Sequence, residues 1–204
     1  MTTRKKIVIA AAMFSVFCLI SLLAAGILAL RSLTDTDSVK SLAAGFMTIG
    51  SPLPEGFHFL SGYTVVGVPV VQIKDDQAKM LYTFTASQSG LPPSKYSEAE
   101  RMIENAAEGK PPSALGYGTS NKIAVRVHDR LTVAGESMHY VLGHTDNPLN
   151  TDKSSTNAFF GAVQSSSTGR LIILLIQRST VLSKDHSPLT IERIKTLTDC
   201  IKSL

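Results

Sequence analysis

Histidines are the side chains of this 204-residue chain whose spacing could create a metal or ligand site. The five are His58, His128, His139, His144 and His186. A hairpin turn around Gly135 would bring His128 and His139 together across two strands. His139 and His144 are five residues apart on one expected strand, so they point to opposite faces unless a bulge intervenes. One hypothesis is therefore a periplasmic ligand- or metal-binding domain, extending to hydrolysis, that uses His128, His139, His144 and Asp146.

The simpler interpretation is that each histidine is solvated or makes a single hydrogen bond. A metal site needs three or four ligands in a defined geometry, and the sequence has no motif with that spacing. It also lacks Gly-x-Ser-x-Gly and His-Glu-x-x-His, and Cys200 falls in an expected helix with no histidine close in sequence. We therefore predict no catalytic residue and no cofactor, and we favour a binding protein over an enzyme.

A glycine-rich segment offers a candidate surface for a partner. Gly116, Tyr117 and Gly118 precede an expected strand, whereas a phosphate-binding loop needs a helix N-terminus behind it. We interpret the segment as a flexible loop. Because loops carry function more often than cores do, Gly116, Tyr117 and Gly118 become candidate partner-binding residues. The plain alternative is a connection between a helix and a strand.

The strongest pattern in the sequence is an uncharged segment near the N-terminus. Residues 7–30 are 24 positions without a charge, and as a helix they would span about 36 Å, enough to cross a bilayer. Arg4, Lys5 and Lys6 precede the segment and Arg31 follows it, which predicts a cytoplasmic N-terminus. The alternative is a cleaved signal peptide, with small residues at 24–26. The length favours a retained anchor, because the apolar run continues past those residues.

Charge is distributed unevenly along the chain. The formal net charge is +4, of which residues 1–30 carry +3 and the other 174 residues only +1. The folded part therefore has no basic face for nucleic acid, and we expect none as a partner. The expected partners are the lipid bilayer, through residues 7–30, and a membrane protein. We predict a single-pass protein of the bacterial inner membrane whose C-terminal domain is periplasmic.

The elements that would position these residues follow from hydrophobic periodicity. Apolar residues predict an amphipathic helix over 34–47, a second one after a capping box at 97–100, and a third over 187–204. Strands are predicted at 64–73, 79–86, 122–128, 137–144, 158–164 and 171–176, the last covered on both faces because it is continuously apolar. Residues 131–134 either extend the strand at 122–128 or start the next one. Residue 67 is Gly and residue 69 is Pro, so the strand at 64–73 is expected to be bulged or at an edge.

These elements define an α+β fold class, a transmembrane helix followed by a twisted, mainly antiparallel sheet with packed amphipathic helices. The predicted organisation is a cytoplasmic N-terminus at 1–6, a transmembrane helix at 7–30, a juxtamembrane helix at 31–50 and an extracytoplasmic α+β domain at 51–204.

Short motifs carry a resemblance to known proteins. The run Pro52-Leu53-Pro54-Glu55-Gly56-Phe57 before a strand interrupted at Gly67 resembles a group of uncharacterised bacterial single-pass membrane proteins. The strand through Val133-Ala134-Gly135, the paired strands after it and a closing helix are similar in order to PsbP/Mog1-like α+β domains. The resemblance implies a fold, a place outside the cytoplasm and an accessory role, and it carries over no catalytic residue. Our first hypothesis is therefore a membrane-anchored extracytoplasmic accessory or interaction module, a small subunit of a membrane protein complex.

Overall fold

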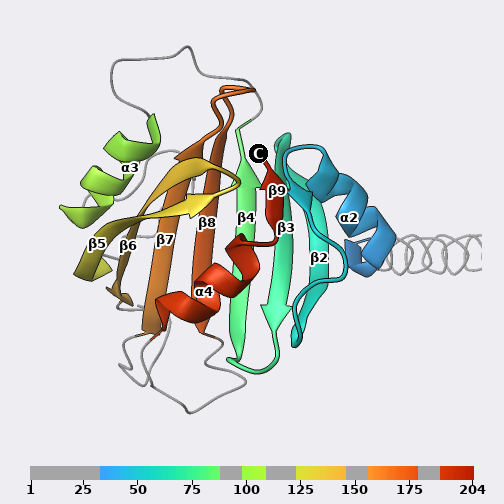
Figure 1. Cartoon of the computed structure of the whole chain (residues 1–204), viewed down its shortest axis with the longest axis horizontal. Coiled ribbons are helices and arrows are strands. Elements are labelled where there is room, and N and C mark those ends of the chain that lie inside the picture. Colours follow the sequence, from blue (N-terminus) through green and yellow to red (C-terminus); the bar gives the residue numbers. More distant parts are fainter. Residues whose placement is uncertain (1–32, 88–97, 109–122, 146–155, 179–188) are drawn as a thin grey trace, which may run out of the picture.

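A computed structural model describes residues 33–87, 98–108, 123–145, 156–178 and 189–204 (Figure 1). These residues form helices and strands. In chain order they are α2 (Thr36–Ala44), β1 (Thr48–Ile49), β2 (Phe57–Val65), β3 (Val68–Asp75), β4 (Met80–Ala86), α3 (Glu98–Ala107), β5 (Ile123–Val133), β6 (Glu136–Thr145), β7 (Thr156–Gln164), β8 (Leu171–Arg178), α4 (Ile191–Thr198) and β9 (Ile201–Ser203).

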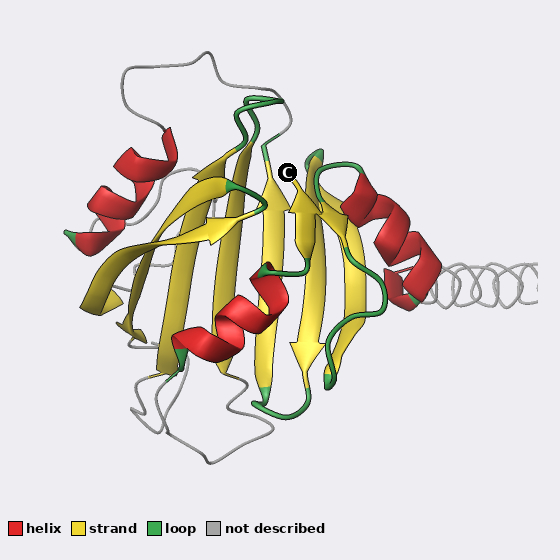
Figure 2. Ribbon diagram, viewed as in Figure 1, coloured by secondary structure: helices red, strands yellow, loops and turns green. Residues whose placement is uncertain are grey.

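One antiparallel sheet dominates the molecule. Its seven strands lie in the order β2-β3-β4-β8-β7-β6-β5, and every neighbouring pair is antiparallel. β1 and β9 form a separate two-stranded pair (Figure 2). The prediction of an α+β fold with a mainly antiparallel sheet and packed amphipathic helices is confirmed for the described residues.

The larger core lies on the sheet face that α2 and α4 cover. α4 crosses this face in Figure 1, and α2 lies beside β2. Alternation along each strand sends every second side chain to this side. The largest of the buried side chains here are Ile73, Tyr82, Phe84, Met138, Phe159, Ile172, Leu174, Ile176, Ile194 and Leu197.

A smaller core lies on the opposite face, beneath α3. The predicted stripe of this helix, Ala99, Met102, Ile103 and Ala106, is buried as expected. It packs against alternate residues of the central strands, which are Val141, Phe160, Ala162, Leu171 and Ile173. β8 therefore contributes to both cores, which confirms the prediction that this strand is covered on both faces.

The strand predicted at 64–73 is wrong, because the chain reverses in its middle. Val66 and Gly67 form a two-residue turn between β2 and β3, with φ of 49° and 79°. Positive φ at both positions is the type I′ geometry that matches strand twist. Pro69 pairs with Thr64 of β2, and the pairing of β3 with β4 begins only at Val70. A proline is tolerated there because no ladder on the β4 side needs its missing N–H.

The C-terminal helix is shorter than the predicted 187–204. α4 begins after Thr190 and ends at Thr198, and Ile201–Ser203 form β9. Ile201 pairs with Ile49 in β1 and is buried, so it meets the core from a strand instead of a helix. Helical and extended spacing both bring Ile201 to the core, so periodicity alone could not separate them. Cys200 consequently lies between α4 and β9, outside any helix.

Residues 31–50 were predicted as a juxtamembrane helix ahead of the domain. The observed helix α2 is capped by the Asp35 carboxylate, which accepts from the Ser38 amide, and it buries Val39 and Ala43 against the sheet. β1 also pairs with the C-terminal strand. Within the described part of the chain, no helix is long and apolar enough to cross a membrane. The predicted span at 7–30 lies outside the described residues and stays a prediction.

Candidate functional site

Two of the predicted histidines lie on one face of the β5–β6 hairpin. Ala134 and Gly135 make its two-residue turn, with φ of 51° and 85°, and this turn fixes the register. Arg130 is opposite His139, and His128 is opposite Val141. His128 and His139 are therefore diagonal neighbours on the same side of the sheet, as the sequence predicted.

A carboxylate from α3 completes this cluster. Glu100 Oε1 lies 3.1 Å from the Arg130 guanidinium and 4.0 Å from His139 Nδ1. We call Glu100, His128, Arg130 and His139 the histidine face. His139 is 8% exposed, whereas His128 and Arg130 are exposed. Burial lowers the pKa of His139, the Arg130 and His128 charges lower it further, and the carboxylates of Glu100 and Glu104 oppose them.

The other predicted ligands do not join this cluster within the described residues. His144 is opposite Ala124 in the ladder, five residues and about 17 Å along β6 from His139. Asp146 lies outside the described residues. His58 is on β2, where its Nδ1 is 3.1 Å from Asp76. Nowhere in the described ranges do three or more histidine, cysteine or acidic side chains gather as a metal site would require.

The remaining site predictions concern residues that the structure leaves undescribed. They are the partner-binding candidates Gly116, Tyr117 and Gly118 and the anchor flanks Arg4, Lys5, Lys6 and Arg31. Each of these stays a prediction.

A buried ion pair that sequence reasoning missed joins α4 to the β3–β4 hairpin. Asp75 is fully buried and receives two bonds from Arg193, Nε to Oδ2 at 2.6 Å and a terminal nitrogen to Oδ1 at 2.8 Å. Asp75 Oδ1 also accepts from the backbone N–H groups of Gln77 and Ala78. This bidentate pair raises the pKa of Arg193. Its two residues are 118 positions apart, so no local pattern could have shown it.

The Arg193 guanidinium makes two further contacts. It lies 4.2 Å from the centre of the Phe57 ring, and it donates to the Glu55 carbonyl at 3.1 Å. Gly56 has φ of 86°, and a Cβ there would meet Gln77 and Arg193 at about contact distance or closer. Within the described residues, Arg193 contacts Asp75, Glu55 and Phe57, and the ion pair with Asp75 joins α4 to the sheet.

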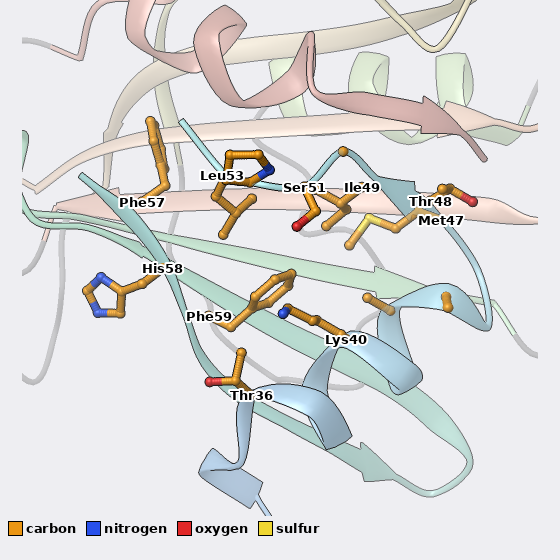
Figure 3. Close-up of a pocket in the computed structure, with 14 residues that line it drawn as sticks. Thr36, Lys40, Met47, Thr48, Ile49, Ser51, Leu53, Phe57, His58 and Phe59 are labelled. Carbon is orange, nitrogen blue, oxygen red and sulfur yellow. The ribbon is translucent and has the colours of Figure 1, made fainter. Parts of the chain in front are cut away.

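A cavity of about 470 Å³ opens between α2 and the chain that follows it (Figure 3). We call it the α2 groove. One side of α2 forms a wall, residues 48–53 form the other, and Phe57 and Phe59 of β2 lie between them. The lining is mostly apolar, and Ala43, Ala44, Met47, Ile49, Leu53 and Phe59 contribute to it. Pockets for small ligands have this size and character.

Exposed apolar side chains gather along one edge of the sheet. Four large hydrophobic residues in the described ranges are conspicuously exposed, and three of them are Leu60 (38%), Val65 (38%) and Val66 (94%). All three belong to β2 or to the turn after it, and β2 is an edge strand. We call Leu60, Val65 and Val66 the β2 edge. The fourth residue, Val127 (41%), lies on the opposite edge strand, β5.

Comparison with known proteins gives no family to which the chain can be assigned. No protein-family model matches its sequence, and no curated protein is similar to it.

Proposed function

We propose that this chain is a membrane-anchored interaction module that serves as an accessory subunit of a membrane protein complex. The uncharged segment 7–30 and its basic flanks support an anchor in the bacterial inner membrane with the domain on the periplasmic side. The sequence resemblance to PsbP/Mog1-like α+β domains, which are mostly accessory and assembly proteins, agrees with this proposal.

The β2 edge is the observation that carries the proposal. An edge strand offers backbone N–H and C=O groups on its outer side, and soluble proteins usually protect such an edge with charges or prolines. Here the edge carries Leu60 and Val65, and Val66 extends from its tip almost fully exposed. Exposed apolar side chains on an edge strand suit the addition of a partner strand, in which backbone hydrogen bonds give affinity and side chains give specificity.

A second candidate function is ligand binding at the histidine face. The neighbouring positions of His128 and His139 support it. Arg130 lies between them and would repel a bound cation, so metal binding has less support than partner binding. Metal analysis and single alanine substitutions at His128 and His139 would test it. Metal-free protein with unchanged behaviour in both variants would remove this candidate.

The experiment for the first proposal is purification of the tagged full-length chain from its native membrane in mild detergent, with mass spectrometry of the bound proteins. The test variant combines Val65→Thr with Val66→Asn, which removes apolar surface and keeps residues that suit a strand and a turn. The matched control is Val127→Thr on β5. A stoichiometric partner that is retained by the wild type and the control but lost from the test variant is the expected result.

Two results would overturn this proposal. One is a full-length chain that is purified without any stoichiometric partner. The other is a partner that the double variant retains as well as the wild type, because the β2 edge would then have no part in the contact.

A further inference from the structure

We infer that the α2 groove binds a single long acyl chain with an anionic head group, as in a fatty acid or a lysophospholipid. The inference rests on the proposed membrane anchor and adds a ligand to it. The groove, its charge and its place in the chain carry the argument together.

The size and lining of the groove select the apolar part of the ligand. A cavity of about 470 Å³ suits one flexible chain and is too small for a whole diacyl lipid. The small side chains of Ala43 and Ala44 leave space along the α2 side of the groove. Met47, Ile49 and Phe59 supply apolar surface that a ligand can contact. Burial of a methylene group in such surroundings stabilises a complex by about 0.8 kcal/mol, so a long chain gains more than a short one.

The charge at the rim selects the head group. Among the described residues that line the groove, Lys40 is the one lysine or arginine, and in Figure 3 it extends from α2 toward β2. Its ammonium group is 3.8 Å from the carboxylate of Asp37, three residues earlier on α2, and both side chains are well exposed. Such a surface pair is weak and leaves the ammonium available to a ligand. Thr36 lines the same end of the groove and adds a hydroxyl that can donate a hydrogen bond.

The position of the groove explains why a lipid is the expected occupant. Thr36 follows Arg31, the basic residue that flanks the predicted membrane span, by five residues, which reach at most about 18 Å when extended. The groove is therefore held close to the lipid–water interface, where single acyl chains and anionic head groups are concentrated. An apolar partner side chain is the alternative occupant, and the experiment below separates the two.

The groove is built by tertiary contacts, so its shape is set before a ligand binds. Gly62 of β2 lets α2 approach closely, because a Cβ there would lie 3.2 Å from the Val39 Cα. Arg170 donates to the Gly45 carbonyl at the end of α2. The Gly50 amide donates to the Cys200 carbonyl at 2.7 Å and fixes the opposite wall. A preformed site spends little free energy on ordering when it binds.

The test is photolabelling of the full-length chain in nanodiscs with palmitic acid that carries a diazirine in its chain. The neutral alcohol with the same chain is the comparison probe. Peptide mapping separates labels in the predicted span, 7–30, from labels in residues 36–59. We expect the acid to label 36–59 and to do so more strongly than the alcohol.

Two variants probe the two ends of the ligand. Ala44→Trp fills the groove and should lower labelling of 36–59 about tenfold, whereas Ser41→Trp, on an exposed part of α2 outside the lining, should not. Lys40→Glu should lower labelling by the acid about three- to fivefold and leave the alcohol unchanged, with Lys195→Glu on α4 as its control. Thermal unfolding of each variant checks that the domain is folded.

Equal labelling of 36–59 in the wild type and both groove variants would overturn the inference, as would label confined to 7–30. Cross-links from 36–59 to another protein in native membranes would assign the groove to a partner instead. A chain that keeps its membrane partner but takes no label refutes the lipid site alone. A chain that leaves the membrane in an alkaline wash refutes the anchor, and with it the proposed function.

Discussion

Val66 has a backbone conformation that is unfavourable for a β-branched side chain. Its φ of 49° lies in the left-handed region, where a β-branched residue is strained, and its side chain is 94% exposed. The usual residue at this position of a type I′ turn is Asn, Asp or Gly. A strained backbone at an exposed apolar residue is expected where the side chain contacts a partner and does not stabilise the fold.

Replacing this valine should therefore stabilise the isolated chain. We expect Val66→Asn to raise the free energy of unfolding by about 0.5–1 kcal/mol, since Asn tolerates positive φ. Urea unfolding measures the change, and Val127→Thr, at an exposed position on β5 beside a register shift, should differ little from the wild type. A less stable Val66→Asn protein would mean that the valine side chain supports the fold.

Substitution of Asp75 should lower the free energy of unfolding. Asp75→Asn keeps an acceptor for the Gln77 and Ala78 amides but leaves Arg193 without its anion, which should cost about 3 kcal/mol of unfolding free energy. Asp76→Asn is the matched control on the next residue, where a partly exposed carboxylate pairs with Lys74 and His58. Only a small change is expected for it. Equal losses in the two variants would contradict a structural role for the buried pair.

At the level of elements, the packing of α3 on β6 should depend on pH. His139 is held in its neutral form, because its pKa in the fold is below the ordinary value of about 6.5. The unfolded chain then binds more protons than the folded one between these two pKa values. The stability that His139 contributes is complete above about pH 6.5 and declines as pH falls toward the folded pKa.

The variant His139→Gln should reduce this decline. Urea unfolding at several values between about pH 5 and 7 measures it, and His58→Gln, an exposed histidine beside Asp76, is the control. Glu100 and Glu104 on α3 and Arg130 and His128 on the sheet stay in place in both variants. A pH profile of His139→Gln that matches the wild type would show that another group causes the decline.

The elements themselves show what sequence can reveal. α2, β4, β7 and β8 were predicted well, because their apolar period and their turns are local. The turn at Val66-Gly67 was missed because valine is an unusual type I′ residue, so the end of β2 and most of β3 were taken as one strand and residues 57–63 were not predicted as a strand. β9 was missed because its partner, β1, is about 150 residues away along the chain.

The candidate site was also predictable from sequence only in part. The neighbouring positions of His128 and His139 followed from the Gly135 turn and the strand period. Glu100 beside them, the Asp75–Arg193 pair and the α2 groove depend on contacts between elements far apart in sequence. Spacing within one chain segment carries no information about such contacts, which arise only when the elements pack.

At the scale of the whole molecule, residues 201–204 should contribute strongly to stability. Removing residues 201–204 takes away the β1–β9 pair, the buried Ile201 and the Leu204 carbonyl that accepts from Ser165. We expect the free energy of unfolding to fall by about 3 kcal/mol or more. Thermal unfolding measures the loss, and Lys202→Ala, at an exposed position, should leave the melting temperature nearly unchanged.

The pairing of β1 with β9 also sets an order in time. A ribosome makes residues 48–49 about 150 residues before their strand partner at 201–203. Until residues 201–203 have been made, the β1–β9 pair cannot form, and the core cluster that includes Phe46, Met47 and Ile201 is incomplete. This core therefore closes late in synthesis, and a nascent chain stalled before residue 201 leaves part of it exposed to solvent.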